Sequence, residues 1–209
     1  MRKETDKSTI DLVEALPEGE WAIRWDLKPK LDEQGRETSV YWYEEASFNH
    51  IPQMDEVGQL ITEWYNKQTD SSIMYGFEWS GHKVLLNEEN KFNFKSLFDL
   101  AVMMQPQIAA WDAANPDLAG KDYIEHEGTD AEGNLIRIPE PTGRPKSVLP
   151  LTLKLGTNDV PEFYTFTTLD ELTDFYLSAA NWAQNCYAAG WYKLGAFDYA
   201  PYEDAISKL

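Results

Sequence analysis

The sequence predicts an α+β fold in which β-hairpins alternate with amphipathic helices. Two short alternating apolar segments, joined by a turn and followed by a helical pattern, occur at 76–105 and again at 149–190. Such a unit buries one face of the hairpin and one stripe of the helix, so successive units pack into one compact domain. We expect an N-terminal arm over 1–20, a hairpin and helix over 21–74, and a hairpin–helix core over 75–209 with an inserted hairpin or loop at 106–147.

The N-terminal part begins with a polar arm that we expect to be loose alone and to order on assembly, because it has little apolar surface. Alternation over 21–27 then predicts a strand with Trp21, Ile23, Trp25 and Leu27 on one face. Residues 32–37 have the composition of a turn, and 38–44 is the predicted partner strand. Pro52 marks a boundary, and apolar residues at helical spacing predict a helix from Met54 to about Lys67.

The middle unit has clear turn and cap residues. Ser80 and Gly81 predict a tight turn between strands at 77–79 and 84–86. Asn87 is a good N-cap, and acidic residues follow in the first turn, where the helix dipole favours them. Pro106 is expected to close this helix after Gln105. The predicted buried stripe comprises Phe94, Leu97, Phe98, Ala101 and Val102.

The insertion at 106–147 interrupts every periodicity with glycine and proline. Residues 123–126 and 134–138 are expected to pair, so that 121–140 forms a projecting hairpin outside the main core. Deleting 110–146 should then leave the remainder folded.

The last unit combines strands at 149–155 and 162–166, a turn at 156–159 and a long helix. Thr168 and Glu171 form a capping box at the start of that helix. Gly190 is expected to end it, and the aromatic segment from Trp191 to Leu209 is expected to lie back over the body. One buried helix face is predicted to comprise Leu172, Phe175, Tyr176, Ala179, Trp182, Ala183 and Cys186.

The amino-acid composition limits the kinds of partner that the chain is expected to bind. Lys and Arg total 18 against 36 Asp and Glu, which gives a formal net charge of −18. Phosphate backbones and anionic membrane surfaces attract clustered cations, so we expect binding to neither nucleic acid nor membrane. Eight Trp and eleven Tyr favour a protein that buries aromatic side chains in cores and interfaces.

The sequence predicts no catalytic, cofactor-binding or metal-binding residue. His50, His82 and His126 have no ligand spacing to one another, and glycine-rich phosphate loops are absent from the sequence. The run from Asp130 to Asn134 has part of a calcium-loop pattern, but a hairpin turn requires the same residues. Cys186 is the single cysteine and lies on an apolar helix stripe, where a thiol acts as a small hydrophobe.

Two alternatives remain open from the residues alone. Thirty-six carboxylates leave room for a glycosidase-like pair. The tryptophan-rich strands around Trp21, Trp25, Trp42 and Trp79 suit a carbohydrate-stacking face, although core packing and a protein interface explain them more simply.

Several segments together resemble a domain family of unknown function in tail and tail-fibre-associated proteins of bacteriophages of gut Bacteroidales, crAss-like phages included. The segments run from Tyr75 to Lys95, Leu151 to Asn158, Glu171 to Tyr176 and Gly190 to Lys193, with an upstream helix pattern from Ile61 to Tyr65. The similarity covers about 50–105 and 148–200, and the chain departs from it at 106–147.

The resemblance implies a non-catalytic virion protein of the tail, collar or fibre attachment, and it supplies no catalytic residues. Its partners would be other phage structural proteins, including fibre or tail subunits, and it would be homo-oligomeric or present in several copies. It would be located in the virion, and in the host cytoplasm during assembly. The alternatives are a tail-fibre assembly chaperone and, from another class, a virion-associated glycan-binding module or hydrolase.

Overall fold

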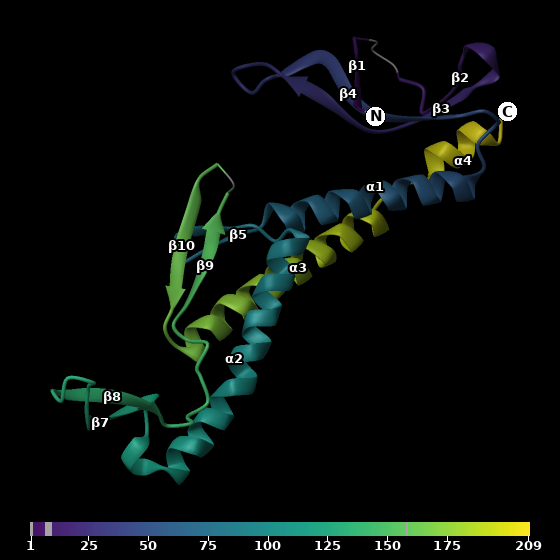
Figure 1. Cartoon of the computed structure of the whole chain (residues 1–209). Coiled ribbons are helices and arrows are strands. Elements are labelled where there is room, and N and C mark those ends of the chain that lie inside the picture. The colour runs from purple at the N-terminus through teal and green to yellow at the C-terminus, as the bar shows by residue number, and fades with distance from the viewer. Residues whose placement is uncertain (1, 7–9, 158) are drawn as a thin grey trace. The chain divides into compact units, whose positions relative to one another are not determined.

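The computed structural model describes residues 2–6, 10–157 and 159–209, and within them the hairpin-plus-helix order is present (Figure 1). The strands form one four-stranded and three two-stranded antiparallel sheets, and α-helices follow three of the hairpins. The α+β class predicted from the sequence is confirmed.

The chain divides into two compact units, where the sequence predicted one domain. Unit 1 comprises 1–69 and 188–209, and unit 2 comprises 70–187. The predicted boundary at 74/75 lies close to the observed one at 69/70. The C-terminal segment belongs with unit 1 because its aromatic side chains pack in that unit's core.

Unit 1 contains a sheet in the order β1-β4-β3-β2. Its strands are β1 (Arg2–Thr5), β2 (Val13–Ala15), β3 (Trp21–Leu31) and β4 (Glu37–Phe48), and a 3₁₀ turn (Pro17–Gly19) precedes β3. The prediction of a loose arm over 1–20 is corrected for its described part, because β1 and β2 form the two edges of this sheet. Residues 1 and 7–9 of that arm lie outside the described residues.

The alternation predicted for β3 holds only as far as Trp25. Ile23 and Trp25 are buried in the core of unit 1, as expected. The register with β4 shifts between Trp25 and Lys28, and Asp26 has a φ of 53°. This irregularity reorients the chain, and Leu27 is therefore exposed.

Helices cover the inner face of this sheet. α1 (Met54–Tyr75) begins where the sequence predicts and runs two turns further than Lys67. Its unit 1 part packs with Leu194, near the end of α3 (Leu169–Gly195), and with α4 (Ala200–Ile206). The buried Tyr202 of α4 donates a hydrogen bond of 2.7 Å to the carbonyl of Arg24, so the later part of the aromatic segment packs on the sheet. Trp191 and Tyr192, at its start, are exposed.

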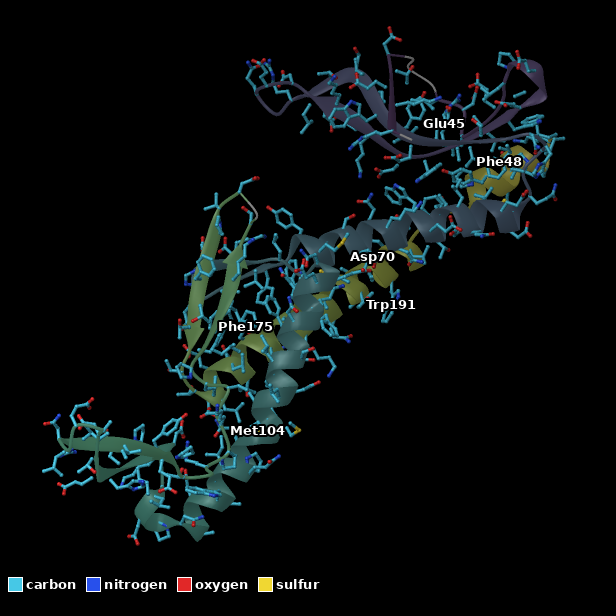
Figure 2. The ribbon with its side chains drawn as sticks, viewed as in Figure 1. Glu45, Phe48, Asp70, Met104, Phe175 and Trp191 are labelled. Carbon is cyan, nitrogen blue, oxygen red and sulfur yellow. The ribbon has the colours of Figure 1, made fainter. Side chains whose placement is uncertain are left out.

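Unit 2 is built around the aromatic ring of Phe175, which is fully buried (labelled in Figure 2). Phe175 meets Trp79, Phe94 and Phe166 at ring-centroid distances of 5.0–5.2 Å. These rings come from β5 (Phe77–Trp79), α2 (Glu88–Ala114) and β10 (Pro161–Phe166), while β6 (His82–Val84) and β9 (Leu151–Gly156) complete the two hairpins.

The predicted helix face of α3 is confirmed. Leu172, Phe175 and Ala179 are buried, and the partly buried Trp182, Ala183 and Cys186 pack against the same core. Tyr176 stacks on Phe98 of α2 with ring centroids 4.4 Å apart. Part of the predicted turn at 156–159, Asn158, lies outside the described residues.

Helices α2 and α3 begin at their predicted N-caps but continue past the residues that were expected to end them. Asn87 caps α2 by accepting the N–H of Asn90 at 2.8 Å, and Thr168 accepts the N–H of Glu171 at 3.2 Å. Pro106 does not end α2, which continues to Ala114 because Ile108, two residues beyond the proline, is buried. Gly190 does not end α3 either.

Gly190 instead permits a close approach of two helices within unit 1. A Cβ built on Gly190 would lie 2.1 Å from Oγ1 of Thr69 in α1. Glycine at this position therefore serves packing, and α3 continues to Gly195.

The insertion contains the end of α2, a 3₁₀ turn (Pro116–Leu118) and a hairpin of β7 (Tyr123–Thr129) and β8 (Leu135–Pro141). The predicted hairpin is confirmed, with Tyr123 opposite Pro141 and Thr129 opposite Leu135. Neither of the two hydrophobic clusters formed by described residues includes a side chain from this hairpin, as predicted.

Candidate functional site

The three histidines each contact one glutamate. His50 lies 3.0 Å from Glu56, His82 lies 2.6 Å from Glu162, and the third pair, His126 with Glu140, crosses the β7–β8 hairpin at 3.2 Å. Among residues 2–6, 10–157 and 159–209, no group of three or more His, Cys, Asp or Glu is arranged to hold a metal ion.

Asp130 organises the turn between β7 and β8. Its Oδ1 accepts the N–H groups of Glu132 and Asn134 at 3.0 and 2.8 Å, and its Oδ2 accepts the side-chain amide of Asn134. Hydrogen bonds from the Asn134 side chain and backbone lower the pKa of Asp130. These contacts are those of a turn-forming aspartate.

Cys186 is partly buried, and burial raises the pKa of its thiol. A raised pKa disfavours the thiolate, which is the nucleophilic form of cysteine. The surroundings of Cys186 therefore suit its place in the hydrophobic core of unit 2.

The tryptophans of the predicted stacking face have separate roles. Trp25 is buried in unit 1 and Trp79 in unit 2, where its Nε1 donates to Asp174 at 3.0 Å. Trp42 lies beneath the guanidinium of Arg2, 4.2 Å from the ring centroid. Trp21 also belongs to unit 1, so the structure divides the four tryptophans between two units instead of assembling one aromatic platform.

The outer face of α2 is the first candidate surface. Phe94, Ala101 and Ile108 are the buried residues of this helix. At about 100° per residue, Phe92 and Met103 lie on the opposite side, and they are 72% and 54% exposed. The α2 outer face comprises these two together with Pro106 and Ala110, and with the exposed Leu100 and Val102 at its two edges. The exposed ion pair of Lys95 with Asp99 lies on the same side, between Phe92 and Met103. Val102 was predicted in the buried stripe, and its 44% exposure corrects that prediction.

A sequence signal for this surface existed. From Leu100 to Trp111 the chain has no charged residue, although 26% of all residues are charged. The interpretation of Pro106 as the helix end divides this segment between a helix and a loop, so the uncharged residues are not recognised as one helix surface. A helix that is apolar on two opposite sides requires cover on both, and unit 2 covers one.

A groove in unit 2 is the second candidate. It has a volume of about 580 Å³ and lies between the start of β5, the residue Lys83 of β6 and one face of α3. Tyr75 is 71% exposed, and Lys83 places its ammonium 3.7 Å from the centre of that ring. The lining residues are Tyr75, Gly76, Phe77, Glu78, Lys83, Ser178, Asn181, Trp182 and Asn185.

The β7–β8 hairpin is the third candidate, and Arg144 holds its base. The guanidinium of Arg144 donates to both carboxylate oxygens of Asp112 at 2.7 and 2.8 Å, and to Asp122 at 3.3 Å. Asp112 belongs to α2, Asp122 precedes β7 and Arg144 follows β8. One side chain therefore links the helix to both ends of the hairpin.

Among the described residues, no helix is long and apolar enough to cross a membrane. Comparisons with protein-family models, with curated proteins and with solved structures give no match for this chain.

Proposed function

We propose that the protein is a non-catalytic structural or accessory component of a bacteriophage virion, in the tail, collar or fibre attachment, and that it acts through protein–protein contacts. The α2 outer face is the observation that carries this proposal. It offers Phe92, Leu100, Val102 and Met103 to solvent along one helix.

The chemistry of this face favours an apolar protein partner. Exposed aliphatic and aromatic side chains that gather on one side of a helix are the usual anchors of protein interfaces. The segment from Leu100 to Trp111 has no charge to pair with nucleic acid or with an anionic lipid. A helix or sheet face of another virion subunit would bury the stripe as the core of unit 2 buries the opposite side of α2.

The virion context rests on the resemblance of 50–105 and 148–200 to tail-associated phage proteins. An assembly chaperone would use the same surface and leave the finished particle. Mass spectrometry of purified particles distinguishes the two, because a structural component is present at constant stoichiometry and a chaperone is absent.

The contact itself is tested by Met103→Glu, which places a charge in the centre of the α2 outer face. We expect the variant to fold, with unchanged circular dichroism, and to be lost from particles. Ala119→Glu adds the same charge in the exposed loop after the 3₁₀ turn and should be incorporated normally. Normal incorporation of Met103→Glu would contradict the proposal.

A second candidate function, glycan binding, is favoured by the unit 2 groove. Tyr75, Phe77 and Trp182 supply aromatic rings, and Ser178, Asn181 and Asn185 supply hydroxyl and amide groups. Sugars are bound by this combination of apolar faces and hydrogen-bonding groups. Glu78 is the single carboxylate among the lining residues, whereas most glycosidases use two, so binding suits the groove better than hydrolysis.

Glycan titration monitored by tryptophan fluorescence tests this second function. We expect a saturable change in fluorescence that Tyr75→Ala abolishes. Tyr123→Ala changes a tyrosine of β7 that does not line the groove, and should leave the fluorescence change intact. A flat titration across capsule and cell-wall glycans would rule it out.

A further inference from the structure

The two edges of the β7–β8 hairpin differ in their free hydrogen-bonding groups. The N–H of Thr142 donates to Asp122, and the N–H of Asp130 donates to Asn134, both at 3.0 Å. Antiparallel pairs alternate between hydrogen-bonded and non-hydrogen-bonded residues. In this register the even-numbered residues of both strands bond each other, and the odd-numbered residues direct N–H and C=O outward.

Proline closes one of these edges. Along β8 the outward positions are Leu135, Arg137, Pro139 and Pro141, and the two prolines have no N–H to donate. Proline at an outward position is a common protection of an edge strand. Along β7 the outward positions are Tyr123, Glu125, Glu127 and Thr129, which all retain an N–H, and no other described strand pairs with β7.

The hairpin also has two chemically distinct faces. Ile136 and Ile138 are about 40% exposed on the face that they share with Ile124 and with the exposed pair of His126 and Glu140. Glu125 and Glu127 lie on the other face, where Arg137 is 3.2 Å from Glu125 and directly opposite Glu127. One arginine thus serves two glutamates, which leaves this face acidic.

A second copy of β7 does not suit this edge in the three central registers, which pair most of the strand. If two copies pair antiparallel with a twofold axis through His126, Glu125 of each lies opposite Glu127 of the other. An axis through either glutamate places that residue opposite itself. Like charges directly opposite destabilise a strand pair, and the chain already has a net charge of −18.

We propose that the β7 edge binds an extended segment of another protein in which lysine or arginine alternates with aliphatic residues. The outward N–H and C=O groups of β7 extend the sheet by one strand. The basic side chains lie beside Glu125 and Glu127, and the aliphatic ones lie beside Ile124, His126 and Gly128 of β7, on the face that Ile136 and Ile138 of β8 continue. This surface deepens the proposed role in protein–protein contact and is separate from the α2 outer face.

The probe is a blocked peptide of alternating lysine and valine, seven residues long to match β7. We expect saturable binding to the full chain that weakens with salt. Amide exchange should slow at Tyr123, Glu125, Glu127 and Thr129, and remain unchanged at Leu135 and Arg137. A peptide of the same composition with all lysines first, and one alternating glutamate and valine, should bind at least tenfold more weakly.

Two variants separate backbone pairing from charge. Thr129→Pro removes one outward N–H without altering the β7–β8 bonds, and we expect about tenfold weaker binding. Leu135→Pro is the matched control, directly opposite on the other edge, and should bind normally. Replacing Glu125 and Glu127 by Gln should weaken binding about fivefold and flatten its salt dependence.

Equal binding by Thr129→Pro and wild type, or protection on β8 instead of β7, would overturn the inference. Equal binding of the clustered and the alternating peptide by the protein would show that the contact is non-specific charge attraction, and would overturn the inference too. These outcomes leave the α2 outer face untouched, because incorporation of Met103→Glu reports on that face alone.

Discussion

At the scale of single residues, Phe175 shows how one aromatic ring joins the elements of unit 2. It is fully buried and meets aromatic rings from β5, α2 and β10. Its position was predictable, because the spacing of Leu172, Phe175 and Ala179 already defines a helix face in the sequence. The three rings that surround it come from distant segments, and helical spacing contains no information about them.

Phe175→Ala should lower the free energy of unfolding by about 3–5 kcal/mol, since it removes a large side chain from a closed core. Leu177→Ala, two residues along the same helix, removes a side chain that is 54% exposed and should change the stability by less than about 0.5 kcal/mol. Urea unfolding measures both. Equal stabilities would show that the core of unit 2 is not centred on this ring.

Charged residues buried in unit 1 give a second case at this scale. Glu45 is 7% exposed, and Nε of Arg24, itself 9% exposed, donates to it at 2.7 Å. Burial raises the pKa of Glu45, but hydrogen bonds from Lys3 and Arg24 outweigh burial and hold that pKa below the ordinary 4.5. Arg24 also pairs with Glu14 of β2, so the network ties the edge strands to the centre of the sheet.

The network predicts acid sensitivity. Because the folded-state pKa of Glu45 is lowered, its contribution is complete above the unfolded value near 4.5 and is lost as the pH falls through the folded value. Glu45→Gln should lower the free energy of unfolding by roughly 3 kcal/mol at neutral pH. This is the lower end of the range for a broken buried ion pair, because Glu14 still contacts Arg24. The stability of this variant should also vary less with pH below 4.5 than that of the wild type. Glu37→Gln, an exposed change on the same strand, should keep the wild-type profile in denaturant titrations at pH 3–7.

At the scale of elements, the sequence predicted where helices start better than where they end. Asn87 and Thr168 act locally, by accepting backbone N–H groups of the next turn, so their effect is visible in a few residues. Pro106 and Gly190 are local stop signals that tertiary packing overrides. Ile108 is buried two residues beyond the proline, and Thr69, more than a hundred positions away, determines what Gly190 contacts.

The role of Gly190 can be measured. In an isolated helix, alanine is favoured over glycine by about 1 kcal/mol, but here the added Cβ would meet Oγ1 of Thr69 at 2.1 Å. We expect Gly190→Ala to destabilise unit 1 by about 1–3 kcal/mol, as overpacking does. Adding Thr69→Ala should recover much of that loss in a double-mutant cycle. Gly195→Ala, where the new Cβ meets nothing within 4 Å, should not be destabilising.

The hairpin and its anchor illustrate the same division. Glycine and proline in the insertion predicted β7 and β8, but no local pattern links Arg144 to Asp112. The Arg144 side chain is 15% exposed and binds Asp112 bidentately, whereas Arg137 on the hairpin is 78% exposed. The β7 edge was also hidden, because proline positions have meaning only once the register is known.

Arg144→Met should loosen the hairpin without unfolding the core of unit 2. We expect faster amide exchange along β7 and β8, with unchanged protection of β9 and β10. Arg137→Met, which removes a solvent-exposed ion pair, should leave all four strands as in the wild type. Loss of protection in β9 and β10 with Arg144→Met would show that the anchor stabilises the core itself.

At the scale of the whole molecule, charge and apolar surface act in opposite directions. A chain with 36 acidic and 18 basic residues repels itself, and the same acidity opposes association of identical copies. Exposed apolar residues occur along the whole described chain, and in the segment from Leu100 to Trp111 of α2 they occur with no charged residue among them. The net negative charge therefore disfavours acidic partners, and the α2 outer face supplies the apolar contact.

This balance predicts how salt affects stability. Raising NaCl from about 10 to 150 mM shortens the Debye length from about 30 to 8 Å, which screens repulsion among the excess carboxylates. Exposed pairs such as Lys95 with Asp99 lose little, because such pairs contribute little at any ionic strength. We expect the melting temperature to rise by about 2–4 °C, the shift that a gain of about 1 kcal/mol gives at this size.

Choline chloride is the matched control, because a bulky organic cation screens charge without fitting a metal site. An equal rise in both salts identifies screening as the cause, and a rise confined to NaCl would indicate specific cation binding. A fall in melting temperature would show that attractive pairs such as Arg24 with Glu45 outweigh the net repulsion. In that case repulsion among the acidic residues would contribute little to the stability of this chain. It would then also be too weak to explain the opposition to self-association that we attribute to the net charge.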